Sequence, residues 1–133
     1  MKSETQIVVE AYFKALASRT IDGILAVISE DIDWYVPGNS DLAPWLGKRS
    51  TKTEIEEFYS LLWAATEPIS VNIGRFIIED DYAIITGEFS SKMLQTGNIV
   101  ESIFFIEIVV ADGLIIKYRL LEDSNAVVEA LTK

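Results

Sequence analysis

The 133-residue sequence predicts an α+β fold, with helices packed on one face of a curved, mainly antiparallel sheet. Its first half holds two helix-start signals, the capping boxes at Ser3–Gln6 and Thr51–Glu54. Its second half holds long strand-like runs, and within Ile99–Asp123 two of them are joined by an Ala-Asp-Gly turn. Asp-Gly between apolar runs predicts a hairpin. We expect one domain covering residues 1–133.

Apolar spacing assigns the remaining elements. The first helix carries Tyr12 in the middle of its apolar face. A regular strand over 31–38 would place Ile32, Trp34 and Val36 on one face. In chain order we expect a helix from residue 3, a short helix over 21–28, a strand over 31–38, a loop over 39–49, a helix over 51–65, strands over 69–78 and 82–93, the hairpin, and a short helix over 124–133.

Composition limits the chemistry available to the chain. There is no cysteine and no histidine, so acid–base work must fall to Asp, Glu, Tyr or Lys, and we expect no metal and no cofactor. The net charge of −10, without a cluster of Lys and Arg, excludes nucleic acid and an anionic membrane surface as partners. The chain shows no signal-peptide core and no run long enough to span a membrane, so we expect a soluble, cytoplasmic protein.

The first strand of the hairpin predicts a second subunit. Residues 103–110 are apolar at every position except Glu107. A strand of an antiparallel sheet normally alternates, because only one of its faces is buried. Here both faces need a cover. The helices of the chain can cover one face, and we expect a homodimer to cover the outer one.

Four stretches resemble one family in order and spacing: AYFKAL, DIDWYVPG, TEIEEFY and ADGLIIKYRLLED. Together they resemble the ketosteroid isomerase and polyketide-cyclase (SnoaL-like) branch of the NTF2-like superfamily, over nearly the whole chain. The resemblance implies a cystatin-like cone, in which a strongly bent sheet wraps around helices and leaves an apolar pocket at its open end. It also implies a small hydrophobic molecule as ligand and dimers through the outer sheet face.

The resemblance also implies site residues. Tyr12 matches the tyrosine that donates to a substrate oxyanion, and Tyr59 matches a second tyrosine that supports it. The general base of the isomerases should precede the proline of the strand-turn, but Val36 stands there, so we do not expect steroid isomerisation. The cyclases instead place a carboxylate late on the last long strand, where Asp123 stands. Alternatively, Asp123 caps the following segment or pairs with Arg119.

The expected pocket is largely aromatic and aliphatic. Trp34 and Trp45 flank an apolar loop that could fold over the pocket as a lid. The residues that we expect to contact a ligand are Trp34, Val36, Trp45, Phe58, Phe104, Ile106 and Arg119.

Two functions remain open at this level. In the first, a cofactor-independent isomerase, cyclase or hydratase acts on a small hydrophobic carbonyl, hydroxyl or epoxide compound, with Asp123 moving a proton and Tyr12 and Tyr59 binding the oxyanion. In the second, a non-catalytic module of the same fold binds a small molecule or a partner. The missing base at Val36 favours the second, and Asp123 with the two tyrosines favours the first.

Overall fold

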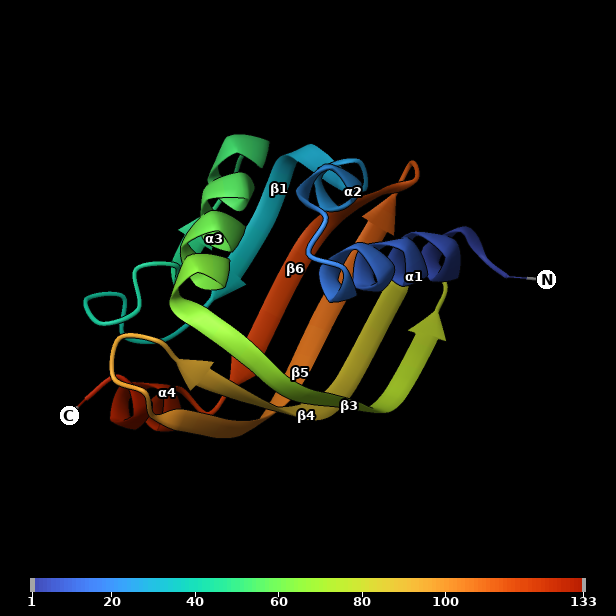
Figure 1. Ribbon diagram of the computed structural model, residues 1–133. Coiled ribbons are helices and arrows are strands. Elements are labelled where there is room, and N and C mark those ends of the chain that lie inside the picture. The colour runs from blue at the N-terminus through green and yellow to red at the C-terminus, as the bar shows by residue number, and fades with distance from the viewer. Residues whose placement is uncertain (1, 133) are drawn as a thin grey trace.

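The computed structural model describes residues 2–132 and shows helices lying over one face of a six-stranded sheet (Figure 1). The strand order is β2-β1-β6-β5-β4-β3, and all neighbours are antiparallel except β1 and β6. In chain order the elements are α1 (Glu4–Ala17), α2 (Ile21–Leu25), β1 (Ile28–Val36), β2 (Gly47–Arg49), α3 (Lys52–Ala65), β3 (Thr66–Glu79), β4 (Tyr82–Met93), β5 (Ile99–Ala111), β6 (Leu114–Glu122) and α4 (Ser124–Ala130).

The helix starts follow the predicted capping. Ser3 accepts a hydrogen bond from the backbone N–H of Gln6, and Thr51 accepts one from that of Glu54. Both satisfy donors that the first turn of a helix leaves unpaired. The C-terminal helix is capped by Asp123, whose side chain accepts from the backbone N–H of Ala126, as one of the alternatives for this residue predicted.

The central hairpin is confirmed. Asp112 and Gly113 both have positive φ, as a tight turn between antiparallel strands requires. Along β5 the residues alternate between buried and exposed, so the sheet has an inner face under the helices and an outer face. On the outer face Ile103 and Phe105 remain 60% and 51% exposed, which agrees with the expectation that this strand is apolar on both sides.

The parallel contact between β1 and β6 places the first and the last strand of the chain side by side (Figure 1). Trp34 pairs with Tyr118 across this contact. Ile32, Trp34 and Val36 are buried on the inner face, as the alternation predicted. The strand begins at Ile28, earlier than expected, since the second helix ends at Leu25.

The β3–β4 hairpin bends beneath the helices. Its register shifts twice, between Pro68 and Ser70 and between Ile73 and Arg75, and such bulges increase bend and twist. Gly87 lies where the bent hairpin approaches the core: a Cβ there would be 2.7 Å from Cζ of Phe104 and closer still to the carbonyl oxygen of Asn72. Within residues 2–132, no helix is long and apolar enough to cross a membrane.

Candidate active site

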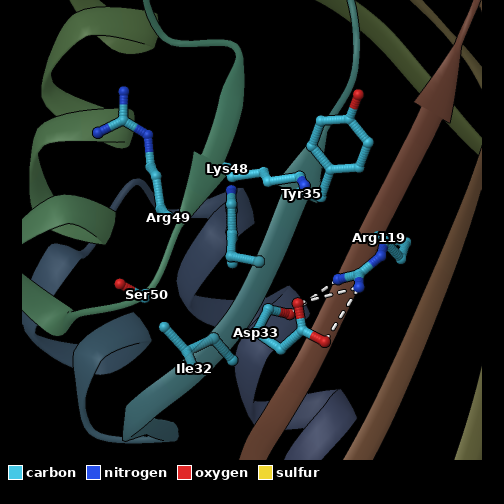
Figure 2. Close-up of a pocket in the computed structure, with 8 residues that line it drawn as sticks. Ile32, Asp33, Tyr35, Lys48, Arg49, Ser50 and Arg119 are labelled. Carbon is cyan, nitrogen blue, oxygen red and sulfur yellow. Dashed lines mark hydrogen bonds and ion pairs between the residues drawn. The ribbon is translucent and has the colours of Figure 1, made fainter.

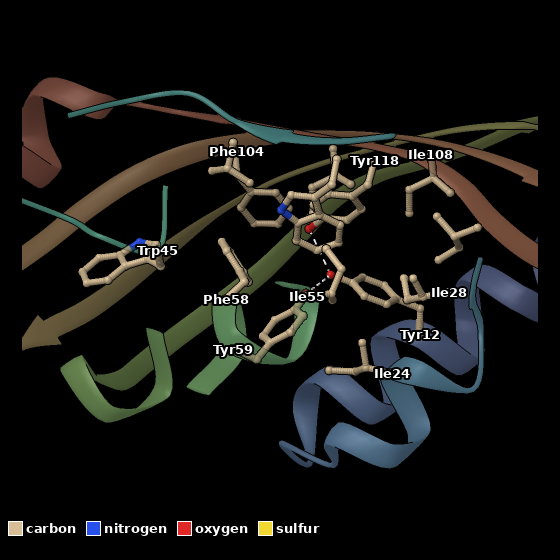
Figure 3. Close-up of a cluster of buried hydrophobic side chains, with 14 of the residues drawn as sticks. Tyr12, Ile24, Ile28, Trp45, Ile55, Phe58, Tyr59, Phe104, Ile108 and Tyr118 are labelled. Atoms are coloured by element: carbon tan, nitrogen blue, oxygen red, sulfur yellow. Dashed lines mark hydrogen bonds between the residues drawn. The ribbon is translucent and has the colours of Figure 1, made fainter. Parts of the chain in front are cut away.

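Three tyrosine hydroxyls meet in the interior, one from α1, one from α3 and one from β6 (Figure 3). The hydroxyl of Tyr12 is hydrogen-bonded to that of Tyr59 and donates to that of Tyr118 over 3.0 Å. Each tyrosine is at most 2% exposed. Burial is the main cause that raises the pKa of all three well above the usual value, so they are neutral donors at ordinary pH.

Trp34 closes this cluster from the side of β1. Its ring stacks on that of Tyr118, with centroids 4.0 Å apart and planes 12° apart. It also meets Phe58 and Tyr59 edge-on, at 5.1 and 6.0 Å between centroids. The predicted lining residues Val36, Phe58, Phe104 and Ile106 are all buried in the same core. These side chains pack against one another where the resemblance implied an open pocket.

Glu122 is the carboxylate that faces this interior. It pairs with Phe104 across the sheet, as Tyr118 pairs with Ile108, and both partners are buried inner-face residues. Burial raises the pKa of Glu122 to about 7. Its charge is also one of the smaller causes that raise the pKa of Tyr118, which lies on the same face of β6. Among residues 2–132, no group donates a hydrogen bond to this carboxylate.

Asp123 and Arg119 do not join the cluster. Asp123 is exposed, and its carboxylate accepts from the backbone N–H of Ala126 at 3.0 Å, which caps α4. Arg119 lies on the outer face of the sheet and binds both the carboxylate and the backbone carbonyl of Asp33. The expectation that Asp123 shares the interior with Tyr12 therefore does not match the geometry, and the suggested pairing of Arg119 with Asp123 is wrong.

The alternation of side chains along β6 explains why Glu122 faces the interior and Arg119 does not. On β6 the inner face is taken by Tyr118, Leu120 and Glu122, so Arg119 and Leu121 point outward. Neither Tyr118 nor Glu122 was predicted from the sequence as a site residue. The available signal was Tyr118 itself: an inward tyrosine places the residue four positions later on the same face.

The loop before β2 covers one end of this interior. Gly38 lies against Leu46 and Ser124: a Cβ added to it would be 2.5 Å from Cδ1 of Leu46 and 3.7 Å from Cβ of Ser124. Trp45 is 4% exposed, so the loop turns its apolar side inward as predicted. Ser124 follows Glu122 by two residues, so the loop lies beside the end of β6 that carries Glu122.

Arg49 fastens this loop to α3. One guanidinium nitrogen donates to the carbonyl of Glu54 and to the carboxylate of Glu57, each at 2.8 Å. The other lies 3.4 Å from the carbonyls of Pro44 and Trp45. The side chain of Arg49 is only 8% exposed, whereas that of its partner Glu57 is 63% exposed.

A hollow of about 400 Å³ lies outside the tyrosine cluster, along β1, β2 and β6 (Figure 2). Figure 2 shows Arg119 turned toward Asp33, and Arg49 pointing the other way, toward α3. The Arg119 guanidinium is the largest cause that lowers the pKa of Asp33, so this carboxylate stays ionised and paired. Within the part of the chain that the structure describes, no three acidic side chains gather to hold a metal ion.

The chain is similar to one protein family and to several proteins of known structure. The model of the SnoaL-like domain matches residues 9–118. An NTF2-like protein of unknown function from Burkholderia pseudomallei has a TM-score of 0.89 at 16% identity, over 99% of this chain and 100% of that one. TerC, co-crystallised with polyporic acid, has a TM-score of 0.84 at 20% identity, over 97% and 98% of the two chains. An LEH-like epoxide hydrolase of M. tuberculosis has a TM-score of 0.74 at 16% identity, over 96% and 89%. No curated protein sequence matched the chain.

Proposed function

Since the chain belongs to the SnoaL-like domain family and has an NTF2-like, cystatin-like fold, we propose that it is a cofactor-independent acid–base enzyme with Glu122 as its proton carrier. The proposed substrate is a small, largely apolar carbonyl, hydroxyl or epoxide compound. The observation that carries the proposal is Glu122, a half-buried carboxyl group that shares the inner face of β6 with Tyr118. An acid whose pKa lies near the working pH is suited to both accepting and donating a proton.

The tyrosine cluster supplies the second part of the chemistry. Three hydroxyls carry three protons, and the two hydrogen bonds among Tyr12, Tyr59 and Tyr118 use two of them. The third proton is available to an acceptor that a ligand brings. A fixed O–H donor in an environment without water stabilises negative charge that develops on a substrate oxygen.

The reaction follows from these two groups. Ionised Glu122 removes a proton from the carbon next to a carbonyl, and the electron pair moves to the carbonyl oxygen, where a tyrosine O–H donates to it. In an isomerisation, protonated Glu122 then returns the proton to another carbon as the carbonyl re-forms. In an aldol-type ring closure, the enolate carbon attacks a second carbonyl carbon of the substrate, the electron pair of that carbonyl moves to its oxygen, and Glu122 protonates the resulting alkoxide. Access requires that the loop carrying Trp45 move away from α3, because the rings behind it are closely packed.

Ligand binding and turnover by the wild type and the Glu122→Gln variant test the proposal. The panel contains apolar ketones, phenols and epoxides, and polyporic acid, the compound co-crystallised with TerC. We expect a saturable thermal shift in both proteins, and turnover in Glu122→Gln that is about 100-fold or more below that of the wild type. Glu101→Gln is the matched control, because Glu101 lies exposed on the outer face of β5. Equal turnover by all three proteins would contradict the proposal.

The close packing of the rings favours a second candidate, a non-catalytic binding module of the same fold. With its stacked and edge-on ring contacts, Trp34 is only 1% exposed. In that case the same panel gives saturable binding without turnover in any of the proteins. The two candidates are therefore separated by the turnover assay.

We propose further that two copies associate through the outer sheet face. Ile103, Phe105 and Leu121 are more than half exposed there, and they lie on neighbouring strands. Beside them Glu107 accepts from Tyr82 and forms an ion pair with Lys117 at 3.3 Å. An exposed apolar patch with a polar rim supports a protein–protein contact.

A further inference from the structure

Trp34 carries a buried donor that nothing in the folded chain accepts. Within residues 2–132, the buried side-chain nitrogens and oxygens without a partner are Nε1 of Trp34 and Nε of Arg49. The guanidinium of Arg49 uses its other nitrogens for four acceptors, so most of its capacity is met. Trp34 has a single N–H, and its whole hydrogen-bonding capacity is unmet.

The ring cannot turn to find a partner. It is stacked on Tyr118 and held edge-on by Phe58 and Tyr59, and it is 1% exposed. Buried polar groups in folded proteins are nearly always paired, and those that are not indicate a functional role or a bound molecule. A tryptophan fixed in this way next to the tyrosine cluster is therefore preorganised to receive an acceptor atom.

We propose that the indole N–H of Trp34 donates to an oxygen of the ligand, as a second donor beside the tyrosine hydroxyl. This inference rests on the proposed function and deepens it, because it names the group that the site recognises. A ligand oxygen with two lone pairs accepts one hydrogen bond from the indole and one from a tyrosine.

The charges around the site restrict the ligand to a neutral oxygen. Glu122 lies on the same inner face of β6 as Tyr118, and its charge would repel a carboxylate or a phosphate. Arg49 lies 5.9 Å from the ring of Phe58, and its charge is directed to Glu57 and backbone carbonyls. The expected ligand is thus a planar, mainly apolar ketone or enol, whose charge develops only during the reaction.

Indole N–H signals in ¹H–¹⁵N NMR spectra test this directly. The chain has three tryptophans, so three such signals are expected, and Trp34→Phe identifies one of them. The probes are acetophenone and α-methylstyrene, which have the same shape but differ in having a carbonyl oxygen or a CH₂ group. We expect acetophenone to move the Trp34 signal to lower field, and α-methylstyrene to leave it nearly in place.

Affinity gives an independent measure. Loss of one hydrogen bond should weaken acetophenone binding to Trp34→Phe by roughly 3- to 10-fold, while α-methylstyrene binds both proteins alike. Trp63→Phe is the control variant, because Trp63 is only partly buried and contacts Arg19 through its ring face. If Trp34→Phe does not fold, assignment of the wild-type signals through contacts with the ring of Tyr118 still decides the question.

The outcomes separate this inference from the proposed function. Saturable binding of acetophenone without a change in the Trp34 signal would overturn the role of Trp34 and leave Glu122 as the proton carrier. A shifted Trp34 signal together with unchanged turnover in Glu122→Gln would support the role of Trp34 and overturn the proposed function. If neither probe nor any compound of the ligand panel binds, both are contradicted.

Discussion

At the scale of single residues, Glu122 is a carboxyl group in surroundings that favour its neutral form. Burial raises its pKa from 4.5 to about 7. Between these values the folded protein keeps a proton that the unfolded chain has lost, so stability falls as the pH rises from about 4.5 to about 7. Above pH 7 the charge is present in both states and the loss is complete.

We therefore predict that Glu122→Gln is more stable than the wild type at pH 8, and that this gain disappears near pH 4. The change in the stability difference between these pH values should be on the order of 3 kcal/mol, because one pKa unit corresponds to about 1.4 kcal/mol. Urea unfolding of both proteins from pH 4 to 8 measures it, with Glu101→Gln as control. A stability difference that is the same at all pH values would contradict the burial of this charge.

Asp123 has a different role in this structure. It accepts from the backbone N–H of Ala126 and so caps α4. We predict that Asp123→Ala lowers the free energy of unfolding by about 1 kcal/mol, as loss of a cap usually does, and leaves turnover unchanged. Asp123→Asn should keep most of the stability, because Asn is also a good cap. Abolished turnover with unchanged stability in Asp123→Ala would show that the catalytic role predicted from the sequence is the correct one.

At the scale of elements, the β3–β4 hairpin depends on its glycines to different degrees. Gly87 has no room for a methyl group, whereas a Cβ at Gly74 would lie 3.4 Å from its nearest neighbours, the carbonyl oxygen and Oγ1 of Thr86. We predict that Gly87→Ala destabilises the fold by about 1 to 3 kcal/mol through overpacking against Phe104. Gly74→Ala is the matched control on the facing strand and should change stability much less. Equal thermal midpoints for the two variants would contradict this account.

Elements of the fold were predicted well where local signals are strong. The capping boxes located α1 and α3, and the Asp-Gly turn located the β5–β6 hairpin. Which side chains of β6 point inward could not be predicted in the same way. Leu120 and Leu121 are adjacent and both apolar, so the strand does not alternate, and a register shift near Val109 changes the pairing with β5. Without a fixed parity, the sequence does not decide whether Glu122 or Asp123 faces inward.

The interior of the site could be predicted only in part for a related reason. Tyr12 and Tyr59 lie on apolar helix faces, so helical spacing turns both toward the core, and the resemblance implied that they meet. The contact between Trp34 and Tyr118 instead requires β1 and β6 to be parallel neighbours. Such a pairing joins strands far apart in the sequence, and no short-range pattern encodes it.

At the scale of the whole molecule, the outer sheet face exposes large apolar side chains that a second subunit would bury. We predict that the wild type sediments at twice the mass of one chain, and that Phe105→Glu sediments as a monomer, because it places a charge among Ile103 and Leu121. Ile7→Glu is the control, since Ile7 is similarly exposed at 56% but lies on α1. A wild type that sediments as a monomer at micromolar concentration would contradict the proposed dimer.

The central claim is that Glu122 holds and releases a proton on the inner face of the sheet, which it shares with Tyr118. The most direct measurement is a ¹³C NMR titration of its side-chain carboxyl, assigned with Glu122→Gln. The account predicts a midpoint near pH 7, which shifts when Tyr118→Phe removes the neighbouring hydroxyl. A midpoint near 4, the ordinary value for a glutamate, would contradict it.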